Sequence, residues 1–192
     1  MRLEMHSAVY AEAERAETAE QALRVLRRLP LAHFGWLLWS LPEPALPHLS
    51  RLLPRMASVD DQLLWTGSEG YSLLRQSVAF ANLLNQRFQS VTGRDLRGAR
   101  VLDFGSGWGR MMRMMLYFSD PNDLWGVDPW RRSLDVCAAD GVLGHLRQSE
   151  YLPTTLPVEG EFDLIIAFSI FTHTSEDATR TALTALRRHV RP

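Results

Sequence analysis

A short segment near the middle of the chain places one acid and three glycines between an apolar pair and a helix-length apolar run. The segment reads Val101-Leu-Asp-Phe-Gly-Ser-Gly-Trp-Gly-Arg110. Val101 and Leu102 predict a buried strand, and the run from Met111 to Phe118 predicts a helix. The glycines permit positive φ and a close approach of the backbone to a ligand. Because free N–H groups at a helix start favour an anion, the segment predicts a loop that binds a nucleotide-type cofactor.

The order of the glycines separates two classes of cofactor. A dinucleotide-binding fingerprint has the form G-x-G-x-x-G, whose last glycine lets the helix pack closely on the strand. Here Gly105, Gly107 and Gly109 occupy alternate positions, and Arg110 stands in the place of that last glycine. Asp103 lies two residues before the first glycine. The segment therefore resembles the first motif of the class I S-adenosylmethionine-dependent methyltransferases, D-x-G-x-G-x-G after a hydrophobic strand.

This resemblance implies S-adenosyl-L-methionine as the cofactor. Asp103 and the loop residues Gly105, Ser106 and Gly107 would hold its methionine end. The assignment is physically reasonable, because a carboxylate attracts an α-ammonium group and a helix N-terminus stabilises an α-carboxylate.

The end of the second predicted strand, Leu124–Val127, carries another acid. Asp128 follows the glycine loop by about 20 residues, a position from which an acid can accept hydrogen bonds from ribose hydroxyls. The resemblance assigns this role to it. In the family, an Asp and a small residue that follow the third strand often contact the adenine, and a Leu-Pro pair comes after them. This chain has the pair, Leu152-Pro153, but it lacks the Asp and has Gln148 and Ser149 in that place. Because a glutamine carbonyl can accept from an exocyclic amine, Gln148 and Ser149 are candidate adenine contacts.

The predicted fourth strand, Leu164–Phe168, is a continuous apolar run typical of a strand buried on both faces. Ser169-Ile-Phe-Thr-His173 follows, where ligands of α/β sheets bind, and resembles the fourth motif of small-molecule methyltransferases. His173 is the candidate catalytic base for a hydroxyl or protonated amine acceptor. In the alternative interpretation it anchors the loop or contacts the cofactor. The N/D-P-P-Y/F motif of base-modifying enzymes is absent, which argues against DNA or glutamine-amide acceptors.

The order of predicted elements divides the chain into two parts. Residues 1–97 predict only helices: an amphipathic helix over 6–28, short helices over 31–40 and 45–53, a loop over 60–70, and a long helix from an N-cap at Ser68. From residue 98 strands and helices alternate, which predicts a parallel sheet with right-handed crossovers. The resemblance implies that this part is a Rossmann-like α/β domain with strand order 3-2-1-4. We expect residues 1–97 to form a lid and residues 98–192 to bind S-adenosylmethionine.

One stretch of the predicted lid has a family counterpart. Trp65, Thr66 and Gly67 lie in the predicted loop and are similar to stretches that close over the cofactor in several sugar- and small-molecule-modifying methyltransferases. Trp65 and Gly67 are therefore candidate cofactor contacts. A turn between two helices would use the same residues.

Composition narrows the classes of partner. The 21 basic and 22 acidic residues nearly cancel, so no broad surface for nucleic acid or anionic lipid is expected, and a small-molecule or glycan acceptor fits better. The single cysteine, Cys137, excludes an internal disulfide and fits a reducing compartment. Without a secretory signal or an apolar run long enough to span a bilayer, we expect a soluble cytoplasmic protein. No metal site is predicted.

The chain ends at His189-Val-Arg-Pro192, where related sequences continue with Gly-Gly and three further strands. We therefore expect a domain that is truncated after its fourth strand and the helix that follows. Such a domain would have an open sheet edge, which favours self-association. The first hypothesis is a methyltransferase. The alternative is a non-catalytic methyltransferase-like module that works by association. A nicotinamide oxidoreductase is disfavoured by the glycine spacing.

Overall fold

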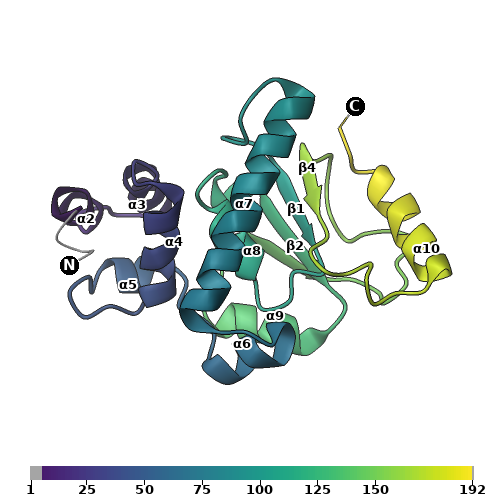
Figure 1. Ribbon diagram of the computed structural model, residues 1–192, viewed down its shortest axis with the longest axis horizontal. Coiled ribbons are helices and arrows are strands. Elements are labelled where there is room, and N and C mark those ends of the chain that lie inside the picture. The colour runs from purple at the N-terminus through teal and green to yellow at the C-terminus, as the bar shows by residue number, and fades with distance from the viewer. Residues whose placement is uncertain (1–5, 192) are drawn as a thin grey trace.

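The computed structural model describes residues 6–191. A group of helices lies beside the long helix α7, and a parallel sheet and the helix α10 follow on its other side (Figure 1). The helices of the first half are α2 (Ser7–Ala13), α3 (Ala19–Leu26), α4 (Leu31–Ser40), α5 (Leu49–Leu52), α6 (Val59–Thr66) and α7 (Gly70–Thr92). Within the described residues, no helix combines the length and the apolar character that crossing a membrane requires.

The single helix predicted over residues 6–28 is wrong, because the chain forms α2 and α3 there. The Thr18 side chain accepts a hydrogen bond from the Gln21 N–H at 3.3 Å and so begins a new helix. A hydroxyl residue that caps the backbone in this way interrupts an otherwise regular apolar pattern.

The loop predicted over residues 60–70 is also wrong, because α6 occupies most of it. Ser58 caps α6 by accepting from the Asp61 N–H at 3.1 Å, and its hydroxyl donates to the Asp61 carboxylate at 2.7 Å. Gly67 ends α6 in the left-handed conformation. The predicted N-cap at Ser68 is wrong, because α7 begins at Gly70 and its N-cap is Glu69. The Glu69 side chain makes no capping hydrogen bond.

The second half has the predicted α/β pattern. Within residues 6–191, four parallel strands form one sheet in the order β3-β2-β1-β4, which confirms the Rossmann-like fold and its strand order. The strands are β1 (Val101–Phe104), β2 (Leu124–Asp128), β3 (His145–Gln148) and β4 (Leu164–Ile166). The connecting helices are α8 (Arg110–Met115), η1 (Pro121–Asp123), α9 (Arg131–Ala139) and α10 (Glu176–Arg187). Asp103 at the end of β1 stands in register with Gly126 of β2 and Ile166 of β4.

The fourth strand packs into the hydrophobic clusters on both faces of the sheet, as predicted, but it is shorter and less fully buried than predicted. β4 ends at Ile166, and Leu164 and Ile165 are only half-buried because β4 lies at the edge of the sheet. The chain then leaves the sheet, and Phe168 packs edge-on against Phe80 of α7, with 4.4 Å between the ring centroids.

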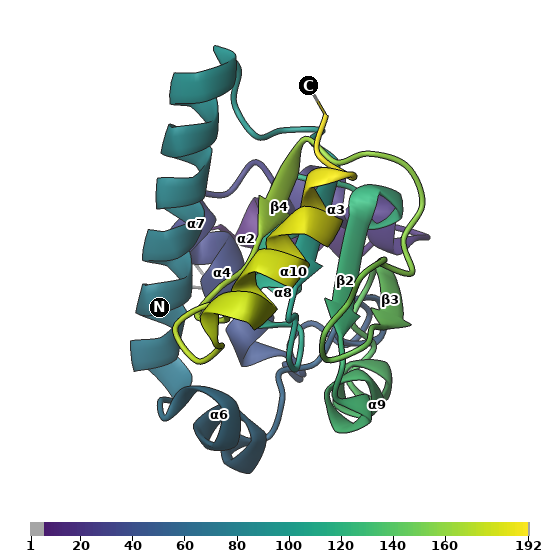
Figure 2. The ribbon, with the colours of Figure 1, turned by 90° about the vertical axis from the view of Figure 1, so that its right-hand side faces the viewer.

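Hydrophobic clusters on both faces hold the sheet. The helices of the first half and α8 cover one face, whereas α10 covers the other with Ala182, Ala185 and Leu186 against Leu102 and Phe162. Figure 2 shows α10 in front of the strands, with α2, α3 and α4 behind them. At one end of the molecule α6 lies beside α9, and this end holds the candidate site (Figure 1).

Candidate cofactor site

A cavity of 330 Å³ lies at the carboxyl end of β1, between the two halves of the chain. It brings together some of the predicted site residues, which come from three segments that are far apart in sequence. These residues are Trp65 of α6, Asp103, Gly105, Ser106 and Gly107 of the glycine loop, and His173 of the loop after β4. Ligands of open α/β sheets bind at this edge, so the position agrees with the predicted role.

The predicted residues Asp128, Gln148, Ser149 and Gly67 do not line this cavity. Ser149 nevertheless lies next to Asp128, because its N–H donates to the Asp128 carbonyl at 3.2 Å. Gln148 donates through Nε2 to the carbonyl of Pro129 at 3.1 Å. The three residues therefore form one cluster at the ends of β2 and β3. Gly67 ends α6, and a Cβ added to it would meet no atom within 4 Å.

Two glycines make the floor of the cavity possible. Gly105 has φ 75° and Gly107 has φ 53°, a region that side chains rarely adopt. A Cβ on Gly105 would overlap the Ile170 side chain, and a Cβ on Gly107 would stand 3.1 Å from Cδ1 of Trp65. The loop backbone is therefore approached closely from the side on which a ligand would bind.

Three buried side chains hold the glycine loop from behind. The Gly107 N–H donates to the Asp128 carboxylate at 2.8 Å, and the other Asp128 oxygen accepts from the Trp130 N–H at 2.9 Å. The Cys137 thiol donates to the Gly107 carbonyl at 3.3 Å. Arg113 donates to the carbonyl of Trp108 at 2.5 Å. The loop conformation is thus fixed by the protein itself.

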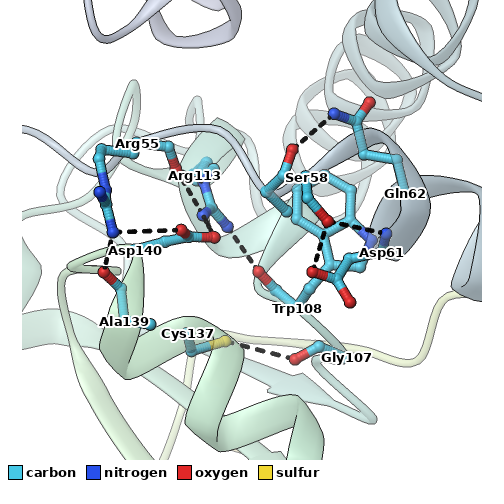
Figure 3. Close-up of polar contacts among 11 residues, drawn as sticks. Arg55, Ser58, Asp61, Gln62, Gly107, Trp108, Arg113, Cys137, Ala139 and Asp140 are labelled. Atoms are coloured by element: carbon cyan, nitrogen blue, oxygen red, sulfur yellow. Dashed lines mark hydrogen bonds and ion pairs between the residues drawn. The ribbon is translucent and has the colours of Figure 1, made fainter.

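Arg113 also connects the loop to the helical half. Its guanidinium donates twice to the Arg55 carbonyl, at 2.7 and 3.1 Å, and forms an ion pair with Asp140 at 3.3 Å (Figure 3). Arg55 in turn donates to the Ala139 carbonyl at 2.5 Å at the end of α9. One buried cation therefore ties the segment before α6 to the glycine loop. The sequence carried only a weak signal for this role, an arginine within the apolar run of α8.

Burial sets the electrostatics of the site. It raises the pKa of Asp103 to about 7; Arg110 opposes this shift, and the neighbouring Asp128 adds to it. Burial lowers the pKa of Arg113 to about 10, which still leaves the guanidinium charged at neutral pH. The pKa of the Cys137 thiol is raised to about 12 by burial, so the thiol stays protonated and fits the predicted packing role.

An aromatic pair covers one side of the site. Trp65 of α6 lies against Trp130, with 4.9 Å between the ring centroids, and the Arg132 guanidinium lies 5.4 Å from the Trp65 ring. Arg132 also pairs with Asp61 of α6 at 3.2 Å. These contacts hold α6 over the glycine loop and α9.

His173 lies on the exposed side of the cavity. The backbone N–H of His173 donates to the Ile170 carbonyl at 3.1 Å. Within the described residues, the His173 side chain makes no hydrogen bond or ion pair. Sequence reasoning did not assign Arg110, Gln76 and Phe168, which also line the cavity. Arg110 stood in the motif, but Gln76 gave no signal among the other polar residues of α7.

Comparison with known proteins agrees with the geometry of the site. The methyltransferase domain family model matches residues 101–192. None of the curated proteins matches the chain significantly.

Two solved structures share the fold at low sequence identity. An S-adenosylmethionine-bound amino pentose methyltransferase, CalS10 from Micromonospora echinaspora, aligns with a TM-score of 0.53 and 16% identity, covering 71% of this chain and 53% of that one. DesVI from Streptomyces venezuelae aligns with a TM-score of 0.53 and 16% identity, covering 69% and 52%. The chain thus spans about half the length of these proteins.

Proposed function

We propose that this chain, whose residues 101–192 belong to the methyltransferase domain family, is an S-adenosylmethionine-dependent methyltransferase of a small-molecule or glycan acceptor. The observation that carries the proposal is the convergence of Asp103, the glycine loop and Asp128 at one sheet edge. Residues 1–97 serve as a lid through α6, and residues 98–192 hold the cofactor.

The residues present fit this cofactor. The Ser106 hydroxyl is buried and has no partner among residues 6–191, so a polar ligand group can satisfy it. The glycines at 105 and 107 let Ile170 and Trp65 lie directly against the loop backbone. Asp103 would bind the α-ammonium group and Asp128 the ribose hydroxyls. The Ser149 hydroxyl, also buried without a partner there, would bind adenine together with Gln148.

Bound S-adenosylmethionine supplies an electrophilic methyl group on a sulfonium. The chain orients the two reactants and excludes water, because Trp65 and Ile170 cover the loop from opposite segments. His173 accepts the acceptor's proton where the acceptor is a hydroxyl or a protonated amine. A neutral amine needs no base, and His173 then only positions it.

A sugar is the acceptor class that the comparisons favour. CalS10 is an amino pentose methyltransferase, and it shares the fold of the part of the chain that aligns with it. The near-neutral charge of the chain agrees with such an acceptor.

Calorimetric titration with S-adenosylhomocysteine, beside NADH, tests the cofactor class. We expect the first ligand alone to bind, and Asp128→Ala to abolish binding. Asp135→Ala is the matched control, since Asp135 is an exposed acid on the neighbouring helix. Binding of NADH alone would contradict the proposal. Transfer of the labelled methyl group to a panel of amino sugars would then identify the acceptor.

The edge position of β4 favours a second candidate, a non-catalytic module that associates through this edge. Sedimentation at micromolar concentration distinguishes the two candidates. Self-association, together with no binding of S-adenosylhomocysteine, would favour the module.

A further inference from the structure

A buried cation that has no hydrogen-bond or ion-pair partner among the described residues faces the cavity. Arg110, the first residue of α8, is 7% exposed and lines the cavity. Its Cζ lies 4.3 Å from the centroid of the Phe168 ring. Among residues 6–191, no hydrogen bond or ion pair engages its guanidinium. The ring covers one face of the guanidinium, which leaves the N–H groups in its plane available to a ligand.

The other buried arginine of α8 shows what a structural role requires. Arg113 is 0% exposed, and its guanidinium is engaged by the carbonyls of Trp108 and Arg55 and by Asp140. Buried charged groups are normally satisfied in this way, because desolvation without a partner is costly. Arg110 lies on the same helix and lacks such partners among residues 6–191, so its donors are open to a ligand in the cavity.

Asp103 lies in the same cavity but does not neutralise Arg110. Each group favours the charged form of the other, although no ion pair joins them. A carboxyl group and a guanidinium held apart in one buried cavity match a ligand that carries both an ammonium group and a carboxylate. The planar guanidinium binds a carboxylate through two parallel hydrogen bonds, and no other arginine or lysine lines this cavity within the described residues.

We propose that Arg110 is the carboxylate receptor of the cavity. The carboxylate belongs either to the methionine end of the cofactor, with Asp103 on its ammonium group, or to the acceptor. The first of these sources rests on the proposed function. The proposal also accounts for an arginine where a dinucleotide-binding loop has its last glycine.

Three ligands that differ in their amino-acid part test whether the carboxylate that Arg110 binds belongs to the cofactor. The wild-type chain is titrated with S-adenosylmethionine, with its decarboxylated form, and with methylthioadenosine, which lacks the amino-acid part. We expect the carboxylate to strengthen binding about tenfold to a hundredfold, as charge-assisted hydrogen bonds do. Arg110→Gln loses this preference and Arg110→Lys keeps part of it, whereas methylthioadenosine binds all variants within about twofold. Arg180→Gln, at an exposed position on α10, is the matched control.

Acetate serves as a probe that needs no cofactor. Its effect on the Arg110 side-chain NMR signal is followed in the free chain, with methylthioadenosine, and with S-adenosylhomocysteine. If S-adenosylhomocysteine alone blocks acetate, the receptor binds the cofactor carboxylate. If acetate still binds beside S-adenosylhomocysteine, the receptor belongs to the acceptor.

The proposal is overturned if acetate shifts no Arg110 signal in any state and Arg110→Gln weakens all three adenosine ligands equally. Arg110 would then only support the fold. A wild-type chain that binds none of these ligands refutes the proposed function instead, while acetate binding to the free chain still decides the role of Arg110.

Discussion

The two rims of the cavity are built in different ways. The glycine loop is held from behind by Asp128, Cys137 and Arg113, all of them buried. The loop after β4 packs on its neighbours through Phe168 and Ile170, but among residues 6–191 its hydrogen bonds are all local, such as the Thr172 hydroxyl donating to the Ser169 carbonyl at 3.1 Å, and His173 on it is exposed. The difference indicates that the cofactor side is preorganised and that the acceptor side can adapt.

The stability of the chain should follow the same division. Substitutions behind the glycine loop should lower the free energy of unfolding strongly, whereas substitutions on the loop after β4 should not. The predictions below are ordered by that effect.

Arg113→Met should have the largest effect. It leaves the buried carbonyls of Trp108 and Arg55 and the Asp140 carboxylate without their donor, which should cost about 3 kcal/mol or more. Urea unfolding measures this loss. Arg97→Met, at an exposed position, is the control. A loss below about 1 kcal/mol would show that Arg113 does not hold the loop.

Asp103 should make stability depend on pH. Its pKa is about 7 in the folded chain and near 4 in the unfolded chain, so the folded state binds a proton that the unfolded state releases. Raising the pH from 5 to 7 should therefore lower the free energy of unfolding by about 2 kcal/mol through this group.

Comparison with Asp103→Asn isolates that contribution, because the amide does not titrate. The difference between the two unfolding free energies should change across this pH range. A constant difference would contradict the raised pKa.

Asp128→Asn should have a moderate effect. The amide nitrogen cannot accept a hydrogen bond, so either the Gly107 or the Trp130 N–H loses its acceptor, at a cost of about 1 to 2 kcal/mol. Thermal unfolding measures the change. An unchanged melting temperature would argue that the Asp128 carboxylate does not hold the loop.

His173→Ala should have the smallest effect on stability, within about 0.5 kcal/mol, because the side chain is exposed. S-adenosylhomocysteine affinity should also stay unchanged, while turnover of a hydroxyl acceptor falls about a hundredfold or more if His173 is the base. Turnover that stays at the wild-type level would assign His173 to the loop alone.

Local patterns predicted much of the fold. The alternation of apolar runs and turns predicted the parallel sheet, the family resemblance supplied its strand order, and the glycine motif located the floor of the cavity. The capping pair Ser58 and Asp61 was present in the sequence and could have predicted α6. The half-burial of β4 could not be predicted, because an apolar run does not reveal which strand lies at an edge.

The two buried arginines of α8 show which contacts the sequence alone does not predict. Arg113 donates to the carbonyl of a residue 58 positions earlier in the chain, and no local pattern encodes that contact. Arg110 was visible in the motif, but its burial without a partner depends on Phe168 and on the packing of α8. Tertiary packing therefore decides which of two arginines on one helix faces the cavity.

Amide hydrogen exchange tests the contrast between the two rims most directly, with and without S-adenosylhomocysteine. We predict that peptides covering residues 103–109 are protected before ligand is added, whereas peptides covering residues 169–173 exchange rapidly and become protected only with ligand. Equal exchange of both segments in the free chain, or no added protection on either segment with ligand, would contradict a preorganised cofactor loop facing an adaptable acceptor loop.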